Sequence, residues 1–358
     1  MNTTRHTLDW NLPLLPAITQ RLLDSADGDF VDLSSALVIV PTVQSGRRLR
    51  ECLALAVAKQ GRGLFPPEIV TPDVLLGQAI KDQAIASEAT VTAAWVTVLG
   101  AIDATQFTAL LPIAPQQSTG WQIGMAQRLM QLRNELGEEG LDFTLAAQRA
   151  ADAGHETERW RQLARLEGLY LDQLHHRGLQ DPKQARRTAA HTYQAPAHLQ
   201  RIILAASPDP QPLSLHALRH AAASVAVEVW IYAAETAHFD AWGRPLTDHW
   251  TQRPLDLEGW NCRLQTVASP QAAAALISQS LRDKAPESVL VGLADPNLNP
   301  IVVDTLQQAQ LASYDPEGQA LHIDGVGRLS ELLCQLCESP DITSVRTLLQ
   351  HPDILQWL

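Results

Sequence analysis

The stretch Leu37-Val38-Ile39-Val40-Pro41-Thr42-Val43-Gln44-Ser45-Gly46-Arg47-Arg48 decides the fold class of this chain. Its first six residues form a continuous apolar run that ends in Pro-Thr, which predicts a buried strand over residues 37–42. The next six residues predict a turn into a helix that runs to Lys59. A buried strand followed closely by a helix is typical of an α/β fold with a parallel sheet.

The same order of strand, loop and helix precedes this stretch. A strand is predicted over Arg5–Trp10, a turn at Asn11-Leu12-Pro13 and a helix over Leu14–Asp24. In P-loop nucleotide-binding proteins the first such turn carries G-x-x-x-x-G-K-[S/T], whose N–H groups and lysine hold the phosphates. This turn has no Gly and no Lys, and no predicted strand ends in the Asp-Glu pair that would hold Mg²⁺. We therefore expect the layout of a nucleotide hydrolase without its phosphate machinery, and no bound cofactor.

The length, cysteine content and net charge of the chain limit the kinds of protein that it can be. The 358 residues are enough for two or three domains, and we find neither a signal peptide nor an apolar run near the roughly 18 residues of a membrane span. Four cysteines are too few for a disulfide framework in this chain, which favours a reducing cytoplasm. The net charge of −12 argues against a protein that coats polyanions, but it leaves room for a local basic strip.

The pattern changes twice along the chain. After a short strand predicted at 66–72, residues 73–195 are rich in Ala, Leu, Gln and Arg and show helical spacing. Two apolar stripes there predict amphipathic helices: Ile123, Leu129, Leu132 and Leu136 form one, and Trp160, Leu163, Leu166, Tyr170 and Leu174 form the other. From residue 196 the α/β pattern returns, with strands at 199–206 and 225–232 around a helix at 213–223.

A second α/β unit is predicted after an irregular connector at 233–261. It has strands at 263–268 and 288–294, a helix at 270–284 and further helices beyond 295. The expected organisation is residues 1–72 plus 196–255 as a first core, 73–195 as a helical insertion, and 262–358 as the start of a second core.

Polar and basic residues follow the strand at 37–42. Arg47, Arg48 and Arg50, with Thr42 and Ser45, could present guanidinium and N–H groups to a nucleic-acid phosphate. The alternative is an ordinary solvated helix start, and the sequence leaves both open. Ligands of open parallel sheets bind beyond the carboxyl ends of the strands, where the loop carrying Gln211 should also lie.

Two pairs of possible metal ligands are better explained without metal. His216 and His220 stand four residues apart on a predicted helix, but no third ligand accompanies them in the sequence. Cys334 and Cys337 have C-x-x-C spacing inside a helical pattern, which favours buried small hydrophobes. We expect no metal site and no catalytic triad.

Taken in order, four diffuse stretches resemble the N-terminal part of the B subunit of AddAB-type helicase–nucleases, the bacterial double-strand-break repair complexes. They cover residues 37–53 with the strand at 66–69, residues 158–182, residues 202–242, and residues 268–329. The segment Ser207-Pro208-Asp209-Pro210-Gln211 resembles a degraded form of the Gly-Asp-x-x-Gln motif of superfamily 1 helicases. A plain proline-rich turn explains it as well.

The resemblance implies RecA-like cores without a functional P-loop, the first interrupted by a helical insertion. It also implies a DNA repair role beside a helicase partner subunit. The family's C-terminal PD-(D/E)xK nuclease has no counterpart in these residues, so we expect no nuclease or ATPase activity from them.

Two functions follow as hypotheses. In the first, an inactivated helicase module binds or guides DNA through Thr42, Ser45, Arg47, Arg48, Arg50 and Gln211. In the second, a purely structural module docks a protein partner. An exposed arginine strip at the mouth of the first core would favour the first, and an apolar, Trp-rich face with scattered arginines the second.

Overall fold

The computed structural model describes residues 3–24, 28–116, 118–251, 259, 264–285, 289–315, 318, 325–338 and 340–357. The chain divides into two compact units, Met1–Pro254 and Leu255–Leu358. None of the helices within these described ranges is both long and apolar enough to cross a membrane.

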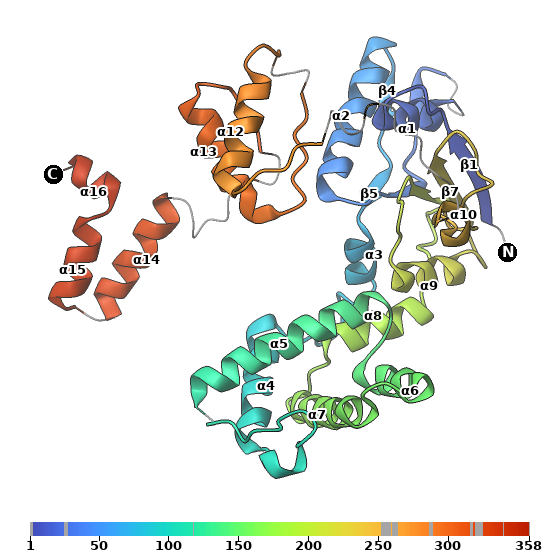
Figure 1. Ribbon diagram of the computed structural model, residues 1–358. Helices are drawn as coiled ribbons and strands as arrows, with labels where there is room; N and C mark the ends of the chain where they lie inside the picture. The colour runs from blue at the N-terminus through green and yellow to red at the C-terminus, as the bar shows by residue number, and fades with distance from the viewer. Residues whose placement is uncertain are drawn as a thin grey trace. The chain divides into compact units, whose positions relative to one another are not determined.

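The first unit is α/β, with a five-stranded sheet in which every strand pairs in parallel, an arrangement compatible with a RecA-like core (Figure 1). In spatial order the strands are β1 (Thr3–Leu8), β7 (Ala226–Tyr232), β6 (Arg201–Ala205), β3 (Ala36–Ile39) and β5 (Glu68–Val70). The sequence did not predict a separate parallel pair, β2 (Phe30–Asp32) with β4 (Gly63–Phe65). Each is only three residues long, too short for a recognisable pattern.

The strands predicted for the first core are present with different bounds. β3 ends at Ile39 rather than residue 42, because Pro41 has no N–H to donate and Thr42 already caps the next helix. β1 ends at Leu8, because Asp9 begins a turn by accepting the N–H of Asn11.

Helices cover both faces of the sheet. α1 (Leu14–Leu23) and α2 (Val43–Lys59) pack on one face, where Leu22, Leu49 and Leu53 meet Val38 and Ile203. α9 (Pro212–Ala221) packs on the other face, where its leucines meet inward-facing residues of β3, β6 and β7. The buried alternation along these strands sends successive side chains into two separate cores.

A helical segment lies between β5 and β6 in the chain. After α3 (Pro72–Gln78) come α4 (Glu88–Ala101), η1 (Ala104–Gln106), α5 (Thr119–Glu138), α6 (Phe143–Ala153), α7 (Thr157–His175) and α8 (Pro182–His191). Of these, α4, α5, α6 and α7 share a core of their own, whereas Leu75 and Leu76 of α3 join the core on the α9 face of the sheet. The stripe predicted on α7 is confirmed from Leu163 to Leu174, whereas on α5 Leu129 is buried and Ile123 is 40% exposed.

After β7, the first unit continues through the short helix α10 (Thr247–Thr251). The described part of the second unit is helical. It contains α12 (Pro270–Leu281), η3 (Pro296–Leu298), α13 (Asn299–Gln308), α14 (Gly325–Glu338), α15 (Ile342–Leu349) and α16 (Pro352–Trp357).

The strands predicted at 263–268 and 288–294 are wrong in the residues that can be judged: 264–268 and 289–294 form none. Their apolar residues pair with no neighbouring strand there, and Leu264 and Leu290 are 62% and 96% exposed. A strand without a partner leaves its backbone groups unpaired, so the apolar pattern alone does not make one. Arg263, Ser288 and residues 319–324 lie outside the described part.

Candidate functional site

The sheet changes winding direction between its neighbouring strands β3 and β6. Leu37 pairs with Ile202 and Ile39 with Leu204, so the two strands end side by side. The chain leaves β3 into α2 on one face and leaves β6 into α9 on the opposite face. Loops that diverge in this way open a crevice at the carboxyl ends of the strands, where ligands of open α/β sheets bind.

Thr42 and Ser45 meet at this edge. The Thr42 Oγ1 accepts the N–H of Ser45 at 3.1 Å, and the Ser45 Oγ accepts the N–H of Thr42 at 3.1 Å. This capping box begins α2 and occupies both hydroxyls. Among the described residues, no acceptor is found for the N–H groups of Val43 and Gln44. These two N–H groups are therefore open donors at the positive end of the helix dipole.

The three arginines lie further along α2 than the sequence suggests. Arg47 follows the first helical residue by four positions, about 6 Å along the axis at 1.5 Å per residue. Arg47 and Arg48 are exposed and pair with Glu51 at 3.6 and 2.9 Å. Arg50 donates to the carbonyl oxygen of Ile69, the middle residue of β5, at 2.6 Å. The arginines therefore occupy the outer side of α2 and the side next to β5, not one row along the crevice.

The other side of the crevice carries a strained residue. Ala206, directly after β6, has φ +49°, and its N–H is held by the carbonyl oxygen of Trp230 at 2.9 Å. This left-handed conformation costs a non-glycine residue roughly 1–2 kcal/mol, and such strain clusters at functional sites. Gln211 is the N-cap residue of α9, and its side chain makes no capping hydrogen bond. The structure thus brings Gln211 and the Thr42–Ser45 cap to the same edge of the sheet.

The turn after β1 is closed by its own side chains. The Asp9 carboxylate accepts the Asn11 backbone N–H at 2.9 Å and the Asn11 Nδ2 at 3.1 Å. The Tyr232 hydroxyl donates to the carbonyl oxygen of Leu12 at 2.7 Å. A P-loop would direct its N–H groups at phosphate, whereas in this turn the Asp9 carboxylate accepts the Asn11 N–H.

Trp10 is a feature of this edge that sequence reasoning missed. It is 57% exposed, and its ring lies 4.8 Å from that of Tyr232, measured between centroids. Composition alone suggests that tryptophans fill cores. Its position as the last residue of the predicted strand, directly before the turn at Asn11-Leu12-Pro13, was the signal that it would be exposed.

The loops that follow β1, β3 and β6 hold no basic residue. Residues 9–13, 40–46 and 206–211 contain Asp9 and Asp209 but no Lys or Arg. Positive potential at the edge therefore comes from the starts of α1, α2 and α9, with the arginines of α2 behind them.

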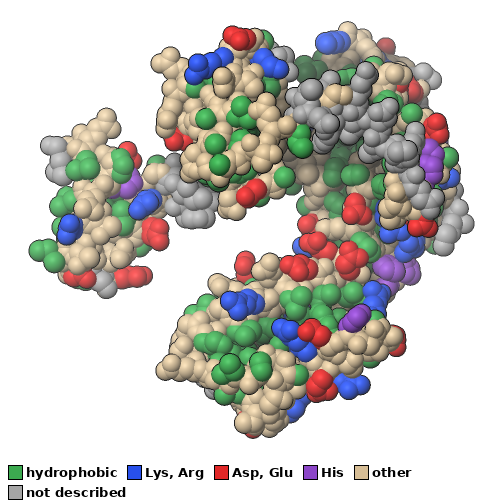
Figure 2. Space-filling model, viewed as in Figure 1, with side chains coloured by type: hydrophobic (Ala, Val, Ile, Leu, Met, Phe, Trp, Pro, Cys, Tyr) green, Lys and Arg blue, Asp and Glu red, His purple; other side chains and the backbone are tan. Residues whose placement is uncertain are grey.

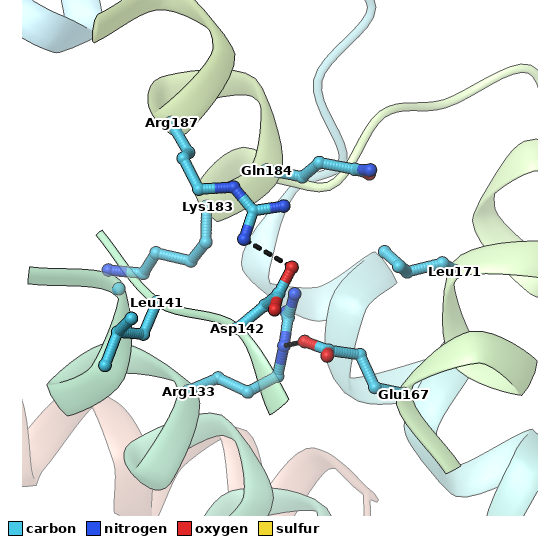
Figure 3. Close-up of a pocket in the computed structure, with 9 residues that line it drawn as sticks. Arg133, Leu141, Asp142, Glu167, Leu171, Lys183, Gln184 and Arg187 are labelled. Atoms are coloured by element: carbon cyan, nitrogen blue, oxygen red, sulfur yellow. Dashed lines mark hydrogen bonds and ion pairs between the residues drawn. The ribbon is translucent and has the colours of Figure 1, made fainter. Parts of the chain in front are cut away.

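A second cluster, buried among the helices, ties α5, α7 and α8 together, and Figure 3 shows its Arg133–Glu167 pair. The guanidinium of Arg133 donates to Glu167 at 2.6 Å and to both oxygens of Asp181 at 2.8 and 3.1 Å. The Tyr170 hydroxyl donates to Asp181 at 2.6 Å. On the surface beside it, Arg187 of α8 pairs with Asp142.

The electrostatics of this cluster are those of a structural network. Burial raises the pKa of Asp181, but hydrogen bonds from Arg133 and Tyr170 outweigh it and the pKa lies below its usual value. Burial raises the pKa of Glu167 above its usual value, and Arg133 offsets only part of this. Asp181 also caps α8 through the N–H of Gln184. Arg133 faces two carboxylates, and the N–H groups of Phe143 and Gln184 satisfy further carboxylate oxygens, so the cluster's hydrogen bonds are made within the fold and it serves packing.

The structure supplies a third imidazole beside His216 and His220. The ring of His191, at the end of α8, lies 4.7 Å from that of His216 and 6.5 Å from that of His220, measured between centroids. Even so, no group of three or more possible ligands in the described ranges is arranged to hold a metal ion. Cys334 and Cys337 are exposed, which corrects the prediction that they are buried. Of the residues of α14, only Leu332 is buried.

The helical segment also carries an open groove between α5 and α7, with a volume of about 480 Å³. Six of its nine lining side chains are apolar and three are charged. The lining residues are Leu110, Met125, Arg128, Leu129, Leu132, Glu156, Arg159, Trp160 and Leu163. Figure 2 shows hydrophobic side chains gathered on the visible face of this segment.

No family model matches the chain, and no curated protein matches it in sequence. The architecture and these sites are therefore what bears on function.

Proposed function

We propose that this chain is a non-catalytic, helicase-like module of a bacterial double-strand-break repair helicase–nuclease. It guides a DNA strand across the carboxyl edge of its sheet and docks the helicase partner subunit. On this proposal the sheet is a RecA-like core without a working P-loop, and the helices between β5 and β6 are an insertion in it. The family assignment rests on the resemblance of the four sequence stretches.

The observation that carries DNA binding is the crevice between β3 and β6. A sharp change of winding, a strained Ala206 and the open N–H groups of Val43 and Gln44 coincide there. Open N–H groups at a helix start suit a phosphate oxygen. Across the sheet, Trp10 lies three strand spacings from Thr42, about 14 Å at 4.8 Å per spacing. An exposed tryptophan at that distance suits a base of the same strand.

The weak local charge sets the expected affinity. With Asp9 and Asp209 in the loops and arginines only on α2, binding by the chain alone should be weak and sensitive to salt. Affinity should rise when the partner subunit supplies further phosphate contacts.

The test is single-stranded DNA binding across a salt series, for the chain alone and in its assembled complex. The Arg47→Ala/Arg48→Ala double variant should reduce the magnitude of the log–log salt slope by roughly 0.7 for each phosphate that the protein no longer neutralises. Arg161→Ala is the matched control, because Arg47 and Arg161 are both 66% exposed and both pair with a glutamate at 3.6 Å. If the double variant and the control bind alike, these arginines are a solvated helix face.

A purely structural docking module is the second candidate. The groove between α5 and α7 favours it, because that surface is apolar, includes Trp160 and carries scattered arginines. On this hypothesis the sheet only supports the helices, and Trp10→Ala would leave single-stranded DNA binding unchanged.

A further inference from the structure

We propose that the groove between α5 and α7 is the docking site for an amphipathic helix of a protein partner, one that carries apolar anchors and a carboxylate. This inference deepens the docking half of the proposed function by naming the surface and the chemistry of its occupant. It does not depend on DNA binding at the sheet edge.

The groove exists because α5 and α7 each pack on α4 while only their inner residues join the common core. Leu129 and Leu163 are buried at its floor, and Met125, Leu132 and Trp160 are only partly covered. A volume of about 480 Å³ is within the range of specific binding sites. The partly covered side chains leave apolar surface that a partner could bury.

The two walls of the groove favour a helical partner segment over an extended strand. Both walls are α-helices whose backbone groups already bond within the helix, so no sheet edge is available for strand addition. Met125, Leu129 and Leu132 follow one another at i, i+4 and i+7 along α5, about 10.5 Å or two turns. A two-turn segment with apolar side chains at helical spacing matches that length. Met125 is flexible enough to adapt to the shape of an anchor.

The charges at the groove are the reason to expect a carboxylate on the partner helix. Arg128 has no hydrogen-bond or ion-pair partner within the described residues, whereas Arg159 pairs with Glu156 at 3.4 Å. Two arginines against one glutamate leave a net positive rim on a chain whose total charge is −12. A carboxylate on the partner helix would pair with Arg128. A nucleic acid fits less well, since the groove has one aromatic ring and two cations over an apolar floor.

The test uses a display library of helical peptides selected on the full chain, followed by titration of the best synthetic peptide. We expect enriched peptides with apolar residues at i, i+3 or i+4, and i+7, and an acidic residue beside them. Arg128→Glu should weaken the best peptide at least tenfold, and peptides selected on that variant should carry Lys in place of the acid. Arg128 is exposed with no partner to lose, so this variant should fold normally. Arg161→Glu, on the same helical segment but outside the groove, should change affinity less than twofold.

Several outcomes would overturn the inference. They are a library without enrichment, peptides that bind Arg128→Glu as tightly as the parent, and competition by a single-stranded oligonucleotide for the groove. A concentration-dependent dimer abolished by Arg128→Glu would show that a second copy of this chain is the occupant. The Arg47→Ala/Arg48→Ala variant separates the two proposals. If it loses DNA but keeps the peptide, both stand; if DNA never binds and the peptide does, only the DNA-guiding function fails.

Discussion

Replacing Asp181 should destabilise the first unit more than any surface change, because its carboxylate joins four hydrogen bonds. Two come from Arg133, one from the Tyr170 hydroxyl and one from the N–H of Gln184. Arg133 is only 7% exposed, and in Asp181→Ala it would keep Glu167 alone as its carboxylate partner. Breaking a buried ion pair costs about 3–5 kcal/mol.

Asp181→Ala also removes the cap of α8 and the acceptor of the Tyr170 hydroxyl. Because all of these contacts share one carboxylate, their free-energy costs do not simply add. We therefore expect a destabilisation of about 4 kcal/mol for Asp181→Ala. For a unit of this size that corresponds to a melting temperature lower by roughly 8–16 °C.

Urea unfolding followed by tryptophan fluorescence measures this change, since Trp95 stacks on Tyr170 with ring centroids 4.2 Å apart. Asp172→Ala is the control, because Asp172 is an exposed carboxylate on α7, the helix that carries Tyr170, and it should change stability by less than about 0.5 kcal/mol. Adding Arg133→Met to Asp181→Ala should cost less than the sum of the single variants. A loss below about 1 kcal/mol for Asp181→Ala would refute the reasoning, since it would mean that water reaches Arg133.

Three further predictions concern other parts of the molecule. Thr42→Ala removes the cap of α2 and should lower the free energy of unfolding by about 1 kcal/mol in urea titrations, with Ser45→Ala close behind. Burial, then the positive charge of neighbouring His191 and Arg219, lowers the pKa of His216, so the folded state favours the neutral ring. Stability is therefore complete above the unfolded pKa of about 6.5 and falls as pH drops toward the folded value. Unfolding at pH 7.5 and 5.5 should show that His216→Gln reduces this loss, and an equal loss in both proteins would contradict it. Calorimetry should detect no micromolar binding of ATP with Mg²⁺, because the Asp9 carboxylate already accepts the Asn11 N–H that a phosphate would need. Micromolar binding with turnover would show that the turn after β1 does hold phosphate.

Much of the fold was predictable because the signal was local. The apolar runs at 37–40 and 202–205 are buried on both faces of the sheet, so no polar residue interrupts them. The helix to Lys59 was also predicted, but Thr42 was assigned to the strand before it, although a short polar residue before a helical pattern signals a cap and capping needs only neighbours in sequence. The lack of Gly and Lys in residues 11–13 is likewise a local feature of the sequence.

The candidate sites were harder, because their residues meet only in three dimensions. Spacing put Arg47, Arg48 and Arg50 near the crevice, yet ion pairs with Glu51 and a bond to Ile69 turn them elsewhere. His191 joins His216 through the packing of α8 on α9, across more than twenty residues of sequence. The hydrophobic periodicity of a sequence does not show that two such distant residues are neighbours.

The sequence by itself determined the parallel α/β character of the first unit, the helical character of the segment between β5 and β6, and the lack of Gly and Lys in residues 11–13. These depend on hydrophobic period and on local turn chemistry, which each segment carries alone. Only the tertiary structure decided that β3 and β6 are neighbours, that Arg133 bridges Glu167 and Asp181, and that a groove opens between α5 and α7. It also decided against strands at 264–268 and 289–294, because a strand forms only where another strand completes its hydrogen bonds.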